Sequence, residues 1–147
     1  MNRMTRLLLA ATLLWSSFTG LAAAQQDIVE ASDMVRGGMQ AIQMIDQGKA
    51  GELWDGATPA TRKRVTRADF TGKIASNRAS LGAPQQRTWV AVNRQVVADP
   101  DADTAGQYVS VEYETRFASK PEGTLRELVS FHLDRDRTWR FAGYVLR

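Results

Sequence analysis

The chain of 147 residues contains no cysteine. Disulfides, zinc–thiolate sites, iron–sulfur clusters and cysteine nucleophiles are therefore excluded, and packing alone must hold the fold. The sequence also lacks a G-x-S-x-G elbow, a phosphate-binding glycine loop and an H-E-x-x-H motif, which mark several enzyme classes. Repeats, low-complexity tracts and interdomain linkers are missing as well. We therefore expect a single packed domain that is not an enzyme and carries no cofactor.

The N-terminus has the pattern of a secretory signal peptide. Arg3 and Arg6 form a basic head, and an apolar stretch covers residues 7–14. Ala22 and Ala24 supply the small side chains that a signal peptidase accepts just before its cleavage point. We predict cleavage after Ala24, which implies a periplasmic or secreted protein.

Cleavage would leave residues 25–147, a length that can bury the core of one domain. The alternative is an uncleaved membrane anchor. However, residues 7–24 are barely long enough to span a bilayer, and Ser16, Ser17 and Thr19 make them more polar. We therefore expect no integral membrane span in the mature chain.

The charge of the chain is small but unevenly distributed. The formal net charge is +3, and without Arg3 and Arg6 it falls to +1, because 17 of the 19 bases then face 16 acids. Residues 62–94 contain eight bases and one acid, whereas residues 99–136 contain nine acids and four bases. The small total, together with export, argues against nucleic acid as a partner. The uneven distribution favours local electrostatic contacts instead.

The first half of the mature chain has helical periodicity. Within residues 27–49 apolar residues recur every three or four positions, at Ile28, Ala31, Val35, Met39, Ile42 and Ile45. This spacing predicts one long amphipathic helix. A short helix around Leu53 and Trp54 follows. A further helical segment begins at Thr58, starts again at Thr66 and stops near Gly82, so we predict one long and two short helices.

The second half has a period of two, which is typical of strands. Four such stretches cover residues 87–98, 107–118, 124–134 and 138–147. The links between them leave no room for crossover helices, so the strands must form an antiparallel meander. The sequence therefore predicts an α+β domain with its helices packed on one face of a four-stranded sheet. On the last strand we expect four residues to face inward: Trp139, Phe141, Gly143 and Val145.

Four stretches of the chain resemble sequences found in other proteins: "MIDQGKAGELWDGA", "RASLGAPQQR", "GQYVSVEYETRFA" and "WRFAGYVLR". Their main marks are Asp46, Gly48, Trp54, Arg78, Leu81, Gly82, Tyr113, Phe117, Glu127, Trp139, Gly143 and Tyr144. In order and spacing, residues from about Asp33 to Arg147 resemble a family of small exported bacterial proteins, catalogued as a domain of unknown function (number 4019). Lys49, Ala50 and Phe70 depart from the family pattern. The resemblance implies helices followed by a meander and a periplasmic location, and no activity.

One acidic segment has the spacing of a metal-binding loop. Asp99, Asp101 and Asp103 match the opening of an EF-hand. The sixth position of such a loop should be glycine and is Thr104, and the twelfth should be glutamate and is Ser110. We therefore interpret this segment as a solvated hairpin loop and predict no metal site.

Glu127 and His132 lie on the same predicted strand, on opposite faces. Alternation places Glu127 at the apolar face, where a carboxylate needs a cation or a hydrogen-bond donor. Arg78 or another arginine could supply it. A structural ion pair is the preferred interpretation, and a ligand-facing acid is the alternative. His132 has no nucleophile or orienting partner that the sequence identifies, so we expect an exposed or half-buried side chain.

Arg62, Lys63, Arg64 and Arg67 form a basic stretch within two helical turns. This stretch is either a solvated helix face or a docking surface for an acidic protein or an anionic envelope surface such as lipid headgroups. The sequence thus predicts a non-enzymatic binding or accessory domain that recognises a protein partner or a small ligand.

The alternative function is that of an enzyme or small-molecule carrier. It requires a pocket between the helices and a curved sheet, as in the cystatin-like and nuclear-transport-factor-like (NTF2-like) architectures that this order of elements resembles. Glu127, Tyr113, Tyr144 and Arg78 would line that pocket or form a buried ion pair.

Overall fold

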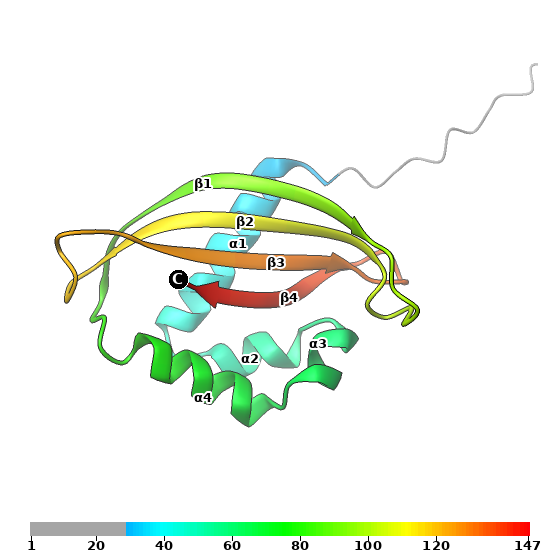
Figure 1. The fold of residues 1–147 in the computed structure, drawn as a ribbon, viewed down its shortest axis with the longest axis horizontal. Helices are drawn as coiled ribbons and strands as arrows, with labels where there is room; N and C mark the ends of the chain where they lie inside the picture. Colours follow the sequence, from blue (N-terminus) through cyan, green and yellow to red (C-terminus); the bar gives the residue numbers. More distant parts are fainter. Residues whose placement is uncertain (1–28) are drawn as a thin grey trace, which may run out of the picture.

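The computed structural model describes residues 29–147. In this part of the chain four helices precede four strands: α1 (Ala31–Asp46), α2 (Ala50–Asp55), α3 (Pro59–Arg64), α4 (Arg67–Arg78), β1 (Pro84–Val97), β2 (Gly106–Phe117), β3 (Leu125–Leu133) and β4 (Trp139–Leu146). Each strand pairs antiparallel with the next, so the sheet order is β1-β2-β3-β4 (Figure 1). The predicted α+β fold with a meander sheet is confirmed.

The predicted signal peptide and its cleavage point lie outside the described residues. Within residues 29–147, no helix combines the length and the apolar character needed to cross a membrane.

Helix α1 lies across one face of the sheet and contacts β1, β2 and β3 (Figure 1). Its buried residues are Met34, Gly38, Ala41, Ile42 and Ile45. Gly38 lies against Tyr113 of β2, and a Cβ added at Gly38 would be 3.2 Å from Cε2 of that ring. The Tyr113 hydroxyl donates a hydrogen bond to the carbonyl of Val35. A side chain at Gly38 would therefore push the helix away from the sheet.

The other three helices lie beside β4, along the edge of the sheet (Figure 1). The backbone N–H of Thr58 donates to the carbonyl of Phe141 at 2.8 Å. The Thr61 hydroxyl donates to the carbonyl of Ala142 at 2.6 Å. On α4, the ring of Phe70 meets Phe141 edge-on, with 5.8 Å between centroids. The helices thus divide between the face of the sheet and the edge of β4.

The last predicted helical segment is two helices, α3 and α4. Val65 is extended between them, and Thr66 caps α4 because its hydroxyl accepts the backbone N–H of Asp69 at 3.1 Å. Pro59 occupies the first turn of α3, where a missing N–H costs nothing. Residues 29–147 therefore contain one helix more than the three predicted.

The core lies between the inner face of the sheet, α1 and the α2–α4 group. Inward residues alternate along β2 and β3, as the period of two predicts. Those of β2 are Val109, Val111, Tyr113, Thr115 and Phe117, and those of β3 are Glu127, Val129 and Phe131. The helices add Ile42, Ile45, Leu53, Phe70 and Ile74. One of these inward positions, Glu127 near the start of β3, is a carboxylate.

The predicted alternation fails in the second half of β4. Phe141 faces the core as expected, but the register against β3 shifts by one residue immediately after it. The shift places Tyr144 opposite Val129 on the inner face and leaves Val145 49% exposed. One extra residue inverts the faces of a strand because the side-chain period is two. The prediction that Gly143 and Val145 face inward is wrong for this reason.

Candidate functional site

The buried carboxylate of Glu127 is surrounded by four hydrogen-bond donors. Its side chain is fully buried. Oε1 accepts from the Tyr144 hydroxyl at 2.7 Å and from Nη1 of Arg78 at 3.2 Å. Oε2 accepts from Nε of Arg87 at 2.6 Å and from the Thr115 hydroxyl. Both carboxylate oxygens are therefore saturated with hydrogen bonds. Glu127 and Arg78 form an ion pair.

A second acid, Asp46, completes the cluster around the buried Glu127. Asp46, at the end of α1, accepts from Nη2 of Arg78 and from Nη1 of Arg87, the latter at 3.0 Å. An acid at a helix C-terminus opposes the helix dipole, and the two guanidinium groups offset that cost. Burial alone would lower the pKa of Arg87, but the hydrogen bonds to Asp46 and Glu127 outweigh it and raise that pKa. The cluster of two acids and two arginines is thus charge-neutral and joins α1 and α4 to the sheet.

The two tyrosines predicted for a pocket have different surroundings. Burial, and then the neighbouring Glu127 charge, raise the pKa of Tyr144 well above its ordinary value. Burial raises the pKa of Tyr113 to about 12, and its hydroxyl is already bonded to the α1 backbone. Glu127 and Tyr113 are therefore packed solid, which weighs against a ligand-facing acid. Of Glu127 and the two tyrosines, Tyr144 is the one that also lines the groove between β4 and α4.

His132 is buried, with 3% of its surface exposed, so the expectation of an exposed or half-buried side chain is wrong. The ring of Tyr108 covers it at 4.5 Å between centroids. Its Nδ1 lies 2.7 Å from a carboxylate oxygen of Asp134 and 3.4 Å from the hydroxyl of Thr58, and its Nε2 lies 3.0 Å from the carbonyl of Ala105.

These contacts do not form a proton relay. A relay needs the hydroxyl on one ring nitrogen and the acid on the other. Here Thr58 and Asp134 share Nδ1 of His132, and a backbone carbonyl occupies Nε2. Burial would raise the pKa of Asp134, but hydrogen bonds from Thr58, His132 and Arg140 outweigh it and lower that pKa. The group ties α3 to the sheet.

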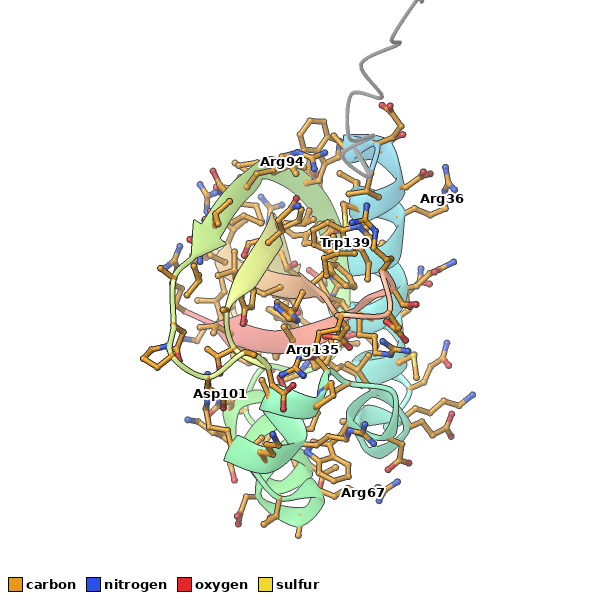
Figure 2. The ribbon with its side chains drawn as sticks, turned by 90° about the vertical axis from the view of Figure 1, so that its right-hand side faces the viewer. Arg36, Arg67, Arg94, Asp101, Arg135 and Trp139 are labelled. Carbon is orange, nitrogen blue, oxygen red and sulfur yellow. The ribbon has the colours of Figure 1, made fainter. Side chains whose placement is uncertain are left out.

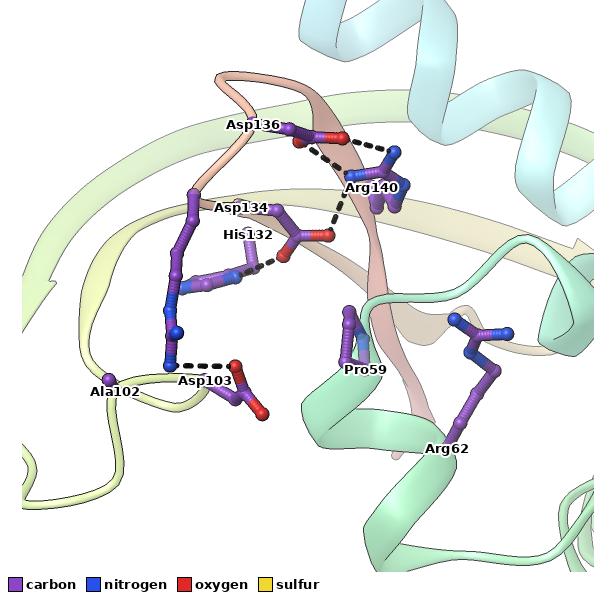
Figure 3. Close-up of a pocket in the computed structure, with 9 residues that line it drawn as sticks. Pro59, Arg62, Ala102, Asp103, His132, Asp134, Asp136 and Arg140 are labelled. Atoms are coloured by element: carbon purple, nitrogen blue, oxygen red, sulfur yellow. Dashed lines mark hydrogen bonds and ion pairs between the residues drawn. The ribbon is translucent and has the colours of Figure 1, made fainter.

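A pocket of about 340 Å³ opens beside His132 (Figure 3). Three arginines and three aspartates line it. Arg140 pairs with Asp134 at 2.9 Å and with Asp136 at 2.7 Å, and Arg135 pairs with Asp103 at 3.0 Å. These opposite charges compensate one another, so the pocket has no strong preference for an anion or a cation.

The four bases of residues 62–67 are spread over separate environments. Lys63 pairs with Asp103, and Arg67 pairs with Asp55 at 3.0 Å. Arg62 of α3 lines the pocket beside His132, on the far side of Pro59 from that histidine (Figure 3). The fourth base, Arg64, reaches 3.4 Å from the Thr104 hydroxyl and lines a different groove. The stretch therefore does not present one continuous basic face.

The acidic loop between β1 and β2 is held by its own backbone. The N–H of Asp101 donates to the carboxylate of Asp99 at 2.8 Å, and that of Asp103 donates to Asp101 at 2.9 Å. Figure 2 shows Asp101 on this loop, well away from Arg67. Within residues 29–147, no group of three histidine or acidic side chains is arranged to hold a metal ion.

A groove of about 350 Å³ lies between β4 and the helices α3 and α4. Its apolar walls are Val65, Phe70, Ile74 and the ring of Tyr144. Among its lining residues in the described chain, Arg64 and Lys73 carry charge, and both are basic and exposed. Lys73 forms no ion pair within residues 29–147. This groove joins apolar surface to positive charge without a neutralising acid.

Several of these residues could not be identified from the sequence. Arg87 and Asp46 complete the Glu127 cluster from 40 and 81 positions away along the chain, so no local pattern connects them. In the sequence, Lys73 is only one of the eight bases of residues 62–94, and nothing distinguishes it from the others. The sequence does contain one indication of the groove wall: Phe70 and Ile74 are four residues apart, so they share a helix face next to Lys73.

Comparison with known proteins gives one family. The family described as "Protein of unknown function (DUF4019)" matches residues 37–144. A search of curated proteins finds no relative that matches the chain. The matched region runs from α1 to β4 and includes the Glu127 cluster and both walls of the groove. Since this match covers most of the chain, the protein belongs to the DUF4019 family of proteins of unknown function.

Proposed function

We propose that this protein is an exported, non-enzymatic binding domain of the periplasm, and that the groove between α4 and β4 holds an acidic, partly apolar segment of a partner protein. One observation carries the proposal. The groove combines exposed bases at Arg64 and Lys73 with apolar walls, and none of its lining residues within 29–147 is acidic.

The size and chemistry of the groove support this choice. Its volume of about 350 Å³ falls at the lower end of the range for ligand sites, roughly 300 to 1,000 Å³. Apolar side chains of a partner would be buried against Phe70 and Ile74, and its carboxylates would meet Arg64 and Lys73. The charge pairs would select for an acidic partner, and the apolar contacts would supply most of the affinity.

A carrier or enzyme is less well supported. A third cavity, of about 540 Å³, lies beside the start of β1 and is lined by Asp46 and Arg78 among others. Both polar side chains are already paired, with each other and with Arg87 or Glu127. A ligand there would have to compete with the buried cluster for its hydrogen bonds, which costs free energy.

Export is the other part of the proposal. It rests on the basic head, apolar stretch and small residues that precede Gln25. Fractionation of cells that produce the full chain, followed by N-terminal sequencing, tests it. We expect a periplasmic product that begins at Gln25, and a membrane-bound product that retains Met1 would contradict it.

Binding is tested by selection from a displayed library of random heptapeptides. The protein without its first 24 residues is the bait, and the Arg64→Glu/Lys73→Glu variant is used for counter-selection. We expect the recovered peptides to be rich in aspartate, glutamate and apolar residues, and to bind the variant about tenfold or more weakly.

The matched control is Arg116→Glu/Lys120→Glu, which makes the same change of charge at one arginine and one lysine that are exposed and lie outside the groove. It should change the affinity of the same peptides by less than about threefold. If no peptide is enriched by the native protein over the double variant, or if both charge changes weaken binding equally, the groove is not the binding site.

A further inference from the structure

Strand β4 is an edge of the sheet, and its hydrogen-bonding pattern can be followed residue by residue. Arg126 and Arg147 exchange two backbone hydrogen bonds, of 2.7 and 2.9 Å. Opposed residues of antiparallel strands alternate between bonded and non-bonded pairs. The pairs Glu127–Leu146 and Val129–Tyr144 are therefore non-bonded. It follows that the N–H and C=O groups of Leu146 and Tyr144 point away from β3.

The start of the same edge is occupied. The outward carbonyl of Phe141 accepts the N–H of Thr58, which agrees with the alternation just described. The carbonyl of Ala142 accepts the hydroxyl of Thr61. In the part of the chain that the structure describes, nothing bonds the outward groups of the following segment. Helix α3 thus covers the first half of the β4 edge and leaves residues 143–147 open.

The open half of the edge borders the groove of the proposed function. Gly143 and Tyr144 line both features, and α4 forms the opposite wall with Phe70, Ile74 and Lys73. At Gly143 an added Cβ would meet nothing within 4 Å, so the strand leaves free space there. An edge strand that faces a helix across an apolar groove is an arrangement in which extended peptides add a strand.

We infer that the partner segment binds as a fifth strand, by pairing its backbone with Tyr144 and Leu146 while its acidic side chains meet Lys73 and Arg64. This inference rests on the proposed function and specifies its geometry. Two residues of β4 with outward N–H and C=O groups offer four hydrogen bonds. Alternate side chains of the added strand point to opposite faces, so every second one would face α4.

Two backbone-methylated isomers of one selected peptide test this inference. N-methylation removes a donor and leaves the side chains and their charges unchanged. The first isomer is methylated at alternate residues and the second at the intervening residues. Only the set of N–H groups that faces β4 is needed for strand pairing. We expect one isomer to bind about tenfold or more weakly and the other to change by less than about threefold.

Hydrogen exchange supplies the second measurement. In the free protein the amides of Tyr144 and Leu146 should exchange rapidly, and saturating unmodified peptide should slow them at least about tenfold. If both isomers bind like the parent peptide and these amides do not change, strand addition is wrong while the groove remains the binding site. If the free protein sediments as a dimer with both amides already protected, a second copy occupies the edge, and the inference is overturned.

Discussion

The Glu127 cluster and the α4–β4 groove are neighbours that share Tyr144, yet their polar groups are used in opposite ways. In the cluster, four donors saturate one fully buried carboxylate, and each arginine is paired twice. In the groove, Arg64 and Lys73 remain exposed, and no acid is among the lining residues that the structure describes. The polar groups of the cluster bond to one another, so they join helices to the sheet and do not offer hydrogen bonds to a ligand. An unsaturated groove is where a partner can gain free energy.

The comparison is tested most severely by Glu127→Gln, which removes the charge and keeps the shape. The two half-buried guanidinium groups of Arg78 and Arg87 would then share only Asp46, so we expect the free energy of unfolding to fall by about 3 kcal/mol. Urea denaturation followed by circular dichroism measures this. Glu114→Gln, at a part-exposed pair with Arg126, is the control and should cost less than about 1 kcal/mol. Equal losses in the two variants would show that the cluster is not what joins helices to sheet.

Tyr144→Phe separates the two regions. It removes the hydroxyl that donates to Glu127 but keeps the ring in the groove. We expect a loss of about 2 kcal/mol in the free energy of unfolding and less than about a threefold change in peptide affinity. Tyr108→Phe loses a hydrogen bond to the carbonyl of Thr104, a neutral acceptor, and should cost about 1 kcal/mol. A large loss of peptide affinity in Tyr144→Phe would contradict the division.

Alkaline pH should weaken the fold through the same tyrosine. The folded pKa of Tyr144 is raised above its ordinary value of 10, so the folded state keeps a proton that the unfolded chain releases. Stability from this group is thus complete below pH 10 and is lost as the pH rises above it, by at most about 1.4 kcal/mol per pH unit. Urea midpoints at pH 9 to 11 should fall more steeply for the native protein than for Tyr144→Phe. If the urea midpoints of the two proteins fell in parallel with pH, folding would not raise the pKa of Tyr144.

Salt should have the smallest effect, and a different one on each region. Raising sodium chloride from about 0.05 M to about 0.5 M screens exposed charges, so the affinity of an acidic peptide should fall several-fold. The buried pairs of the cluster are screened much less, and the free energy of unfolding should change by less than about 1 kcal/mol. Fluorescence titration and urea denaturation at both salt concentrations measure the two quantities. If the peptide affinity did not depend on salt, Arg64 and Lys73 would not contact the acidic side chains of the peptide.

Part of the buried cluster could be predicted from the chain alone. Alternation along β3 placed Glu127 among inward residues, and the cost of burying a carboxylate required a cationic partner such as Arg78. Asp46 and Arg87 were not predictable because their approach to Glu127 depends on where α1 ends and how β1 pairs. The burial of His132 was missed for a similar reason, since Tyr108 and the β1–β2 loop cover it.

The groove was beyond sequence analysis because it depends on a single inserted residue. The bulge after Phe141 turns Tyr144 inward, and strict alternation had turned Gly143 and Val145 inward instead. The basic stretch around Arg64 was visible, yet its side chains diverge once α3 and α4 separate at Val65.

The order of helices and strands, the antiparallel meander and the inward position of Glu127 follow from the amino-acid sequence, because periodicity and short links are local properties of the chain. Which polar groups become saturated, and which edge of the sheet stays open, depends on the folded structure. Those outcomes depend on strand register and on where the helices meet β4, and such contacts join residues far apart along the chain.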